Sequence, residues 1–313
     1  MIFVKTSLDD AWKAYTGETN KRFYEFSQLS LIIILYELLS SLAFGDRITA
    51  YGQDDIWFRF FHQYFPLARI ALELFVIGVF GRLAYMDWFG IPDKIEAKKL
   101  AEENKKNRNK KPKKKTKFRD KVNWYYWLFN LIEGFVYGAL IYIALKYVIF
   151  FLLQTFIGEV TISTPLDTNP ILRNYQTNIL QDIAFSIGSG FYEEVIFRLL
   201  IFTALLFLSK RFKLFKDVQT TNHRMDTAGL KLEFKIPKFE SKQSGALSMI
   251  LFACLLYSLS HSILPFSDFF GVYPLLFRFF FALIMYRIFV WRQKISIVIW
   301  THIMYNFLYF SFA

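Results

Sequence analysis

Cysteine is nearly absent from this sequence, with Cys254 as the only one among 313 residues. A single cysteine excludes an internal disulfide and any metal cluster built on several cysteines. The sequence also contains no G-x-S-x-G stretch, no H-E-x-x-H stretch and no internal repeat. We therefore do not expect a serine nucleophile on a strand-to-helix turn or a zincin-type metal helix. The N-terminal residues lack an apolar core before a small-residue cleavage site, so we expect mature sequence rather than a signal peptide.

The composition combines high hydrophobicity with a positive charge. Hydrophobic residues make up 54% of the chain and aromatic residues 20%, while the formal net charge is +12. This mixture is typical of a membrane protein with basic loops and argues against a soluble enzyme. The lysines lie in polar intervals between apolar runs, without the reader motifs of a nucleic-acid-binding surface, so we expect no nucleic-acid partner.

Seven apolar runs are long enough to be membrane helices, and helices are required because lipid offers no partner to backbone amides. The fourth run is long enough to be kinked, strongly tilted or split. The sequence therefore predicts an all-α, polytopic membrane protein with about seven transmembrane helices. The runs are Leu29–Phe44, Leu67–Tyr85, Trp124–Phe151, Ile179–Leu208, Ala246–Ile263, Val272–Phe289 and Ile295–Phe312.

The basic residues predict the orientation of these helices. The interval 94–121 contains 14 lysines or arginines, and the interval 210–242 contains nine. Alternating helices place both intervals on one side, which the positive-inside rule assigns to the cytoplasm together with the N-terminus, where they face anionic lipid. We divide the chain into a cytoplasmic segment 1–28, two helices in 29–90, a basic loop 91–122, a third helix in 123–157, and a core 178–313 with a basic loop at 210–244.

Two adjacent glutamates and an arginine lie inside the fourth apolar run, in the stretch EEVIFR from Glu193 to Arg198. Charges inside a membrane are costly and often functional. Glu194 and Arg198 are four residues apart, so they share a helix face and can pair. Glu193 is rotated by about 100° from Glu194 and faces a different space without that arginine. The small residues at 188–190 allow a neighbouring helix to approach closely.

Two later runs each carry a histidine with a partner four residues away. In YSLSH, Tyr257 precedes His261 and places its ring over the imidazole. In HIMYN, His302 precedes Asn306, so an imidazole and an amide project together from the last helix.

These groups allow two kinds of site. In an amide hydrolase, Glu193 and His261 position and deprotonate a water, and His302 and Asn306 donate hydrogen bonds to the oxyanion. In a metal site, Glu193, His261 and His302 are the ligands, a set found in several zinc hydrolases. The missing H-E-x-x-H spacing means that zinc is possible but not favoured.

On these residues the sequence resembles the CAAX-protease and bacteriocin-processing family of intramembrane proteases, also called the Abi or CPBP family, which includes the eukaryotic Ras-converting endopeptidase. The family pattern is EExxxR, FxxxH and HxxxN on successive membrane helices. This chain has all three in order, with Tyr257 where phenylalanine is usual. The resemblance covers roughly Asn178 to the C-terminus, and it implies that the last four helices form a catalytic core.

The resemblance also implies roles for individual residues. Glu193 activates water with His261, while His302 and Asn306 stabilise the oxyanion, and no cofactor is required. The implied supporting residues are Glu194, Arg198 and Tyr257.

We therefore predict an intramembrane endopeptidase that cleaves a membrane-associated peptide or protein, as in C-terminal processing of a lipidated, exported or pheromone-like substrate. Membrane lipid and a membrane-anchored substrate are the expected partners. In the predicted orientation His261 lies near the outer end of its helix, which favours a prokaryotic cytoplasmic (inner) membrane. The alternatives are a non-catalytic scaffold or immunity protein of the same family and, less favoured without an internal repeat, a proton-coupled transporter.

The remaining membrane charges have structural interpretations. Arg69 and Glu73 are four residues apart and are predicted to pair. Lys146, Arg82 and Arg287 lie near helix ends and can reach the interface. Interhelical pairs are predicted for Glu37, Glu133, Asp182 and Arg278.

Overall fold

A computed structural model describes residues 15, 22–44, 66–89, 101–102, 104, 123–149, 151–152, 155, 179–212, 220–227, 230–237, 244–263 and 272–312. Most of the predicted segment 1–28 and of the basic loop 91–122 lies outside these residues. The predicted division of the chain into segments stays a prediction.

Long helices cover all seven predicted apolar runs in the described part of the chain, and each begins and ends within several residues of its run. They are α2 (Arg22–Phe44), α4 (Pro66–Phe89), α6 (Trp124–Ile143) continued by the π-helical η3 (Ala144–Ile149), α10 (Ile179–Glu194) continued by the π-helical η4 (Val195–Ile201) and by α11 (Phe202–Phe212), α12 (Ser244–Ile263), α13 (Val272–Arg292) and α14 (Ile295–Phe312).

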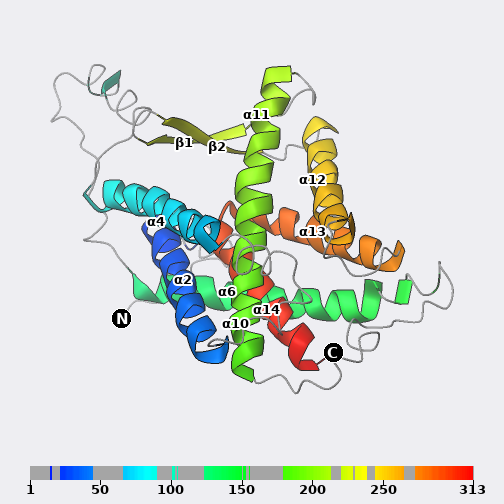
Figure 1. The fold of residues 1–313 in the computed structure, drawn as a ribbon. Helices are drawn as coiled ribbons and strands as arrows, with labels where there is room; N and C mark the ends of the chain where they lie inside the picture. The colour runs from blue at the N-terminus through cyan, green and yellow to red at the C-terminus, as the bar shows by residue number, and fades with distance from the viewer. Residues whose placement is uncertain are drawn as a thin grey trace, which may run out of the picture.

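The fourth predicted run is one uninterrupted helical stretch rather than two separate helices. α10, η4 and α11 form the long light-green helix that runs through the molecule in Figure 1. α2 and α4 lie on one side of it, and α12 and α13 lie on the other. The π-helical stretch η4 is in its middle, so the side chains at that point are accessible to helices from both sides.

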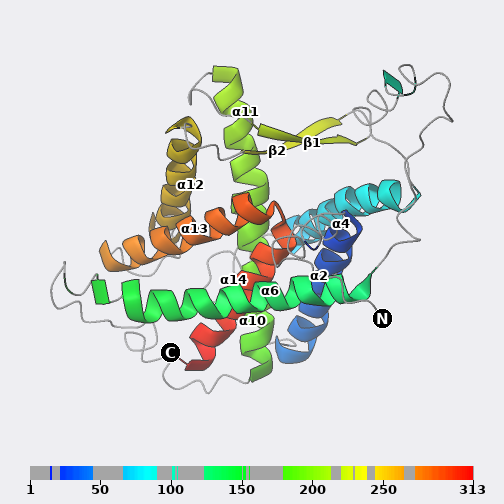
Figure 2. The ribbon, with the colours of Figure 1, turned by 180° about the vertical axis from the view of Figure 1, so that it is seen from behind.

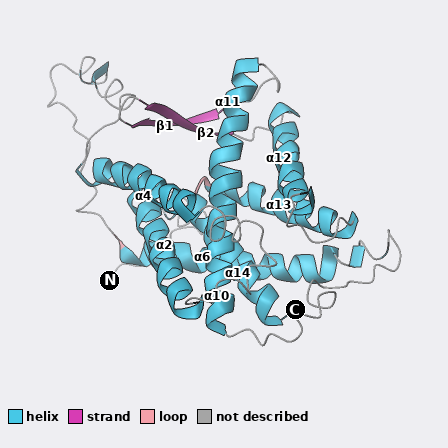
Figure 3. Ribbon diagram, in the orientation of Figure 1, coloured by secondary structure: helices cyan, strands magenta, loops and turns pink. Residues whose placement is uncertain are grey.

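A two-stranded hairpin interrupts the otherwise helical fold within the basic loop predicted at 210–244 (Figure 3). β1 (Thr220–Thr227) and β2 (Leu230–Pro237) are antiparallel, with Thr220 opposite Pro237 and Thr227 opposite Leu230. The sequence signal for it is the alternation of apolar and polar residues in LKLEFKI, the period of a strand. The loop is therefore partly structured, which its hydrophobicity alone does not predict.

Several described helices have the length and apolarity of membrane spans. The stretches Arg22–Leu42, Trp124–Val148 and Pro274–Arg292 are long and apolar enough to cross a membrane, and Leu247–His261 and Ile295–Ser311 are shorter apolar helices. Large apolar side chains on the outer surface, such as Leu42, Leu67, Tyr125 and Phe207, are more than half exposed. Lipid is the natural environment for so much exposed apolar surface. The chain is an all-α, polytopic integral membrane protein.

α14 lies at the centre of the fold, where it contacts α2, α6, α10 and α13. Glycines at 134 and 138 of α6 allow the close approach of α6, which crosses α10 and α14 in Figure 2. A Cβ at Gly138 would lie 2.5 Å from the Thr301 carbonyl oxygen. On α10, a Cβ at Gly190 would lie 2.9 Å from Ile303. The predicted role of the small residues at 188–190 is thereby confirmed, because larger ones would push α14 away.

The helix α2 also holds the beginning of α14. The Glu25 carboxylate of α2 accepts hydrogen bonds from the backbone N–H and the hydroxyl of Ser296, both at 2.8 Å. A carboxylate at this place satisfies an N–H group without a helical partner and interacts favourably with the helix dipole. The preceding residue, Lys294, is 3% exposed. Burial lowers the pKa of its ammonium group to about 8, although the charge of Glu25 acts in the opposite direction.

Interhelical ion pairs account for two of the predicted membrane charges. Glu133 of α6 pairs with Arg292 at the end of α13 at 2.6 Å, and Glu37 of α2 pairs with Arg69 of α4 at 2.9 Å. The predicted pair between Arg69 and Glu73 is wrong, because Glu73 instead accepts a hydrogen bond from a tyrosine hydroxyl of α10. Contacts to neighbouring helices replace a pair within one helix.

Candidate active site

The charged residues of EEVIFR lie at the junction of α10 and η4, where the helix changes from α to π geometry. In η4 the Phe202 N–H donates to the carbonyl of Phe197, five residues earlier. The hydroxyl of Tyr286 on α13 donates to the same carbonyl at 3.0 Å. Single π turns inside α-helices are frequent at functional sites. This turn follows directly after the two glutamates.

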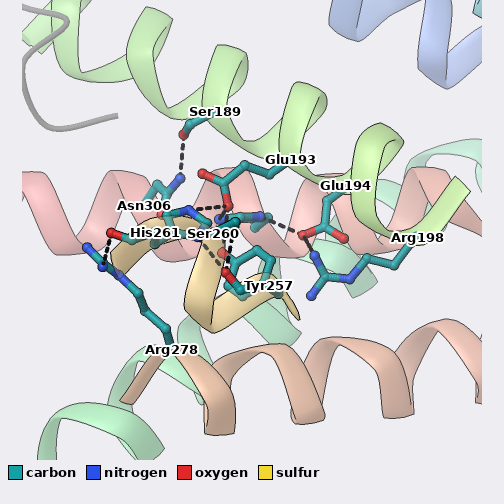
Figure 4. A network of polar contacts seen from close by, with 10 residues as sticks. Ser189, Glu193, Glu194, Arg198, Tyr257, Ser260, His261, Arg278 and Asn306 are labelled. Atoms are coloured by element: carbon teal, nitrogen blue, oxygen red, sulfur yellow. Dashed lines mark hydrogen bonds and ion pairs between the residues drawn. The ribbon is translucent and has the colours of Figure 1, made fainter. Parts of the chain in front are cut away.

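Side chains from α12 and α14 surround the Glu193 carboxylate (Figure 4). Its Oε2 accepts a hydrogen bond from the Tyr257 hydroxyl at 2.6 Å. The same oxygen lies 3.5 Å from Nε2 of His261 and 3.8 Å from Nε2 of His302. The other oxygen, Oε1, accepts no hydrogen bond from the described residues. The structure thus brings together the three groups that the sequence predicted on three separate helices.

The tautomer of His261 follows from its backbone contact. Nδ1 lies 2.9 Å from the carbonyl oxygen of Tyr257, and a carbonyl can only accept, so Nδ1 carries the proton. In the neutral ring Nε2 then has a lone pair and faces Glu193. The rings of Tyr257 and His261 have centroids 4.6 Å apart, as the spacing in YSLSH predicted. His261 is therefore oriented to accept a proton or a hydrogen bond at Nε2.

Glu194 connects Arg198 with His302. Its Oε1 accepts from Arg198 NH1 at 2.8 Å, so the predicted pair is present, and it also lies 2.6 Å from Nδ1 of His302. A carboxylate paired with an arginine is an acceptor, so His302 donates its Nδ1–H and turns Nε2 towards Glu193. The side chains of Glu194 and Arg198 are fully buried. Glu194 is thus the orienting partner of His302, which the spacing of the residues did not predict.

Two tyrosines enclose the Arg198 guanidinium. Its central carbon lies 5.0 Å from the ring of Tyr257 and 4.9 Å from the ring of Tyr286. Cation–π contacts of this kind partly compensate a buried cation. Only NH1 of the guanidinium has a hydrogen-bond partner in the described part of the chain.

Asn306 lies one turn after His302, but its amide is directed to α10. Its Nδ2 donates to the hydroxyl of Ser189 at 2.6 Å, and the residue is 8% exposed. An amide nitrogen carries two hydrogens, so one remains for a further acceptor. Ser189 fixes the direction of that group, a role that the sequence analysis did not assign to it.

Arg278 of α13 was predicted to form an ion pair, and its contact is of a different kind. Its NH1 donates to the backbone carbonyl of His261 at 3.0 Å. Because the last carbonyls of a helix lack partners within the helix, an arginine donor there stabilises the end of α12. No residue spacing could have indicated this contact, since it depends on how α13 crosses α12.

Metal binding was kept as an alternative for Glu193, His261 and His302. In the described part of the chain, no group of three or more histidine, cysteine, aspartate or glutamate side chains is arranged to hold a metal ion. Both the expectation that no cofactor is required and the possible zinc site stay predictions.

Comparison with known proteins supports the resemblance seen in the motifs. The model of the family described as "Type II CAAX prenyl endopeptidase Rce1-like" matches residues 175–308. No curated protein and no solved structure matches the chain. The matched residues include all three motifs, the helices from α10 to α13 and most of α14. Residues 175–308, less than half of the chain, therefore resemble the Rce1-like family of CAAX proteases.

Proposed function

We propose that the chain is an intramembrane endopeptidase in which Glu193 is the general base that activates the hydrolytic water. One observation carries the proposal: Oε2 of Glu193 lies 3.5 Å and 3.8 Å from Nε2 of His261 and His302. Three side chains from three helices meet there, inside a segment that matches a protease family. Such a convergence of titratable groups is characteristic of acid–base sites.

The first step uses the acceptors of this cluster. Water has two hydrogens, and the Glu193 carboxylate and His261 Nε2 are two acceptors on neighbouring helices. A water bound between them donates one hydrogen to each and directs its oxygen at a substrate carbonyl. As the new C–O bond forms, the water proton passes to Glu193.

The second step requires donors for the oxyanion that forms on the former carbonyl oxygen. His302 donates Nδ1–H to Glu194, so its Nε2 becomes a donor when the ring is the imidazolium ion. The free hydrogen of Asn306 Nδ2 supplies a second donor one helical turn away. Donors fixed in advance at such a position lower the barrier without reorganising during the reaction.

The third step completes the cleavage. The tetrahedral intermediate collapses, the C–N bond breaks, and the proton held by Glu193 passes to the leaving amine nitrogen. The products are one peptide with a new carboxyl end, which carries the second water proton until it ionises, and one with a new amine end. Glu193 returns to the carboxylate form for the next turnover.

The membrane setting supports one class of substrate. The site lies among helices that expose large apolar side chains, so a substrate must approach it along or within the lipid phase. We propose a membrane-associated peptide or protein that is lipidated, exported or pheromone-like, processed near its C-terminus. An internally quenched peptide series with and without a lipid anchor tests this class, and equal cleavage of anchored and soluble peptides would contradict it.

For the orientation, we propose a cytoplasmic N-terminus in a prokaryotic inner membrane, on the basis of the basic intervals. A cysteine introduced at 110 should be blocked by a membrane-impermeant maleimide only after the membrane is opened. Labelling in intact cells would reverse the assignment. Cys254 is buried, so it does not compete for the label.

The catalytic proposal is tested with Glu193→Gln in purified, membrane-reconstituted protein, with cleavage followed by mass spectrometry. Because glutamine cannot take a proton from water, we expect at least a 100-fold loss of turnover, the lower part of the range for general-base catalysis. Glu73→Gln is the matched control, since Glu73 is a buried membrane glutamate that contacts a tyrosine outside this cluster. Activity should also survive exhaustive chelation. Full biological activity in a folded Glu193→Gln protein would favour the scaffold alternative.

A further inference from the structure

Arg278 is a charged residue inside an apolar helix, at the edge of the candidate active site. It lies in the stretch Pro274–Arg292, which is long and apolar enough to cross a membrane, and it is partly buried. Its NH1 donates to the backbone carbonyl of His261 at 3.0 Å. In Figure 4 its side chain extends from α13 to the His261 end of the cluster, on the opposite side from Arg198. A charge in such an environment is costly and often functional.

Three other arginines that are buried or partly buried in the described helices have carboxylate partners. The pairs, at 2.9 Å, 2.8 Å and 2.6 Å, are Arg69 with Glu37, Arg198 with Glu194, and Arg292 with Glu133. Arg278 forms no ion pair with any described residue, and the carbonyl that it contacts is neutral. In the described part of the chain, its positive charge is therefore without a counter-ion.

Most of the hydrogen-bonding capacity of the Arg278 guanidinium is unused. The group carries several N–H donors in a planar fork, and the contact with His261 occupies one of them. This fork matches the two oxygens of a carboxylate, and paired hydrogen bonds between such charged groups are among the strong ones in proteins. Arg278 is not fully buried, so a ligand can reach it. The guanidinium is therefore suited to binding a carboxylate.

One residue, His261, connects this cation with the reacting groups. Its backbone carbonyl accepts from Arg278 at 3.0 Å, and Nε2 of its ring lies 3.5 Å from the Glu193 carboxylate. The guanidinium and the proposed hydrolytic water are thus separated by little more than the length of this residue. An extended peptide advances about 3.3–3.6 Å per residue. A peptide with its terminal carboxylate on Arg278 can therefore present to Glu193 a bond that is only a few residues from its end.

We propose that Arg278 is a specificity-determining residue that binds the free C-terminal carboxylate of the substrate. Its guanidinium holds the end of the chain, so the bond that is cleaved lies a few residues before that end and a short peptide is released. The contact with the His261 carbonyl fixes the guanidinium beside the reacting groups. This inference rests on the proposed function, in which Glu193 and His261 activate water, and it names the part of the substrate that the site recognises.

The first test compares two substrates and requires no variant. The best-cleaved lipid-anchored peptide of the series described above is prepared with a free C-terminal carboxylate and with a C-terminal amide. We expect kcat/KM to be about 10- to 100-fold higher for the acid, from the usual strength of hydrogen bonds to a charged group. The difference should appear in KM, because a contact away from the reacting bond binds the substrate and the transition state equally. Equal values for acid and amide would overturn the proposal.

Arg278→Gln separates substrate binding from a structural role. Glutamine keeps a donor for the carbonyl of His261 but has neither the charge nor the fork. We expect kcat/KM to fall about 10- to 100-fold for the acid and to stay unchanged for the amide, so that the preference disappears. Arg287→Gln is the matched control and should keep the preference, because Arg287 is an exposed arginine further along the same helix. An equal loss for acid and amide would show that Arg278 only stabilises the end of α12, and would overturn the proposal.

Two further changes identify the recognised group. Arg278→Lys keeps the charge without the fork, so it should show a reduced preference for the acid, and it serves as the test if Arg278→Gln does not fold. A preference of wild-type size in Arg278→Lys would contradict binding by the fork. On the substrate side, an amidated peptide that ends in glutamate carries a carboxylate beside the chain end instead of at it, and it should be cleaved as slowly as the other amide. Cleavage as fast as that of the free acid would contradict recognition of the terminus.

A binding measurement distinguishes failure of this inference from failure of the proposed function. Lipid-anchored peptides with acid ends and with amide ends, in equal amounts, are equilibrated with Glu193→Gln protein in nanodiscs, and the retained peptides are quantified by mass spectrometry. We expect the acid to be enriched about 10-fold or more, and the enrichment to be absent in Glu193→Gln/Arg278→Gln. Enrichment that depends on Arg278, in a wild-type protein that cleaves no peptide, would support this inference and refute the proposed function. Cleavage of acid and amide at equal rates would do the reverse.

Discussion

Replacing Glu194 with glutamine separates the structural and catalytic contributions of the most buried part of the site. Glu194 Oε1 is the common acceptor for Arg198 at 2.8 Å and for His302 at 2.6 Å. Glutamine has nearly the same shape but no charge. The change therefore leaves a buried guanidinium without its counter-ion and an imidazole without its carboxylate.

The two effects have different sizes. Removing one partner of a buried ion pair costs about 3–5 kcal/mol, because the remaining charge stays in a dry environment. That is a large part of the roughly 5–15 kcal/mol by which folded domains are usually stable. In the Ser-His-Asp triad, replacing the carboxylate that orients the histidine with an amide lowers kcat by about 10⁴. We expect a loss of about 10²–10⁴ in kcat for Glu194→Gln.

A double variant distinguishes loss of stability from loss of catalysis. Replacing Arg198 with methionine as well removes both charges, so the stability of Glu194→Gln/Arg198→Met should return towards that of the wild type. Its activity should stay low, because His302 still lacks its carboxylate. The assays are thermal unfolding in detergent and peptide cleavage in membranes. Recovery of wild-type activity in the double variant would refute the orienting role of Glu194.

Two further predictions concern the position and environment of α14. Gly138→Ala should destabilise the protein by about 1–3 kcal/mol and reduce cleavage, since its Cβ would lie 2.5 Å from the Thr301 carbonyl next to His302. Gly78→Ala, with nothing within 4 Å, is the control for thermal unfolding, and equal effects of the two changes would contradict the close packing. Burial lowers the pKa of Lys294 to about 8. Between pH 8 and about 10.5 the folded protein therefore binds fewer protons than the unfolded chain, so the free energy of unfolding should rise with pH across that window. The rise in the free energy of unfolding should amount to about 3 kcal/mol and should be absent in Lys294→Met. A rise that persists in this variant would mean that another group causes it.

Much of the fold could be predicted from the sequence because a membrane limits the possibilities. Each apolar run must become a helix, so the positions of α2, α12 and α14 follow from hydrophobicity alone. The hairpin of β1 and β2 does not follow from hydrophobicity, because its signal is the short alternation in LKLEFKI and not a long apolar run. The Gly134 and Gly138 spacing on α6 is also visible in the sequence, but it does not say which helix lies against it.

The site could be predicted in part because its residues share helix faces. Spacings of four residues correctly paired Glu194 with Arg198 and placed Tyr257 against His261. The same rule failed for Arg69 and Glu73, since Arg69 found a better partner on another helix. A contact within one helix has a fixed geometry, whereas the choice between two partners depends on which helices are neighbours.

The sequence by itself determined which residues are available for chemistry: two glutamates, two histidines and an amide on three apolar segments. Only the tertiary structure decided which hydrogen-bond partner each of these groups has. It directs the Tyr257 hydroxyl to Glu193, the carboxylate of Glu194 to His302, and the amide of Asn306 to Ser189. The physical reason is that each of these contacts joins different helices and spans 64 to 117 residues of sequence. Helix periodicity determines which face a residue occupies, but only the packing of helices determines what that face meets.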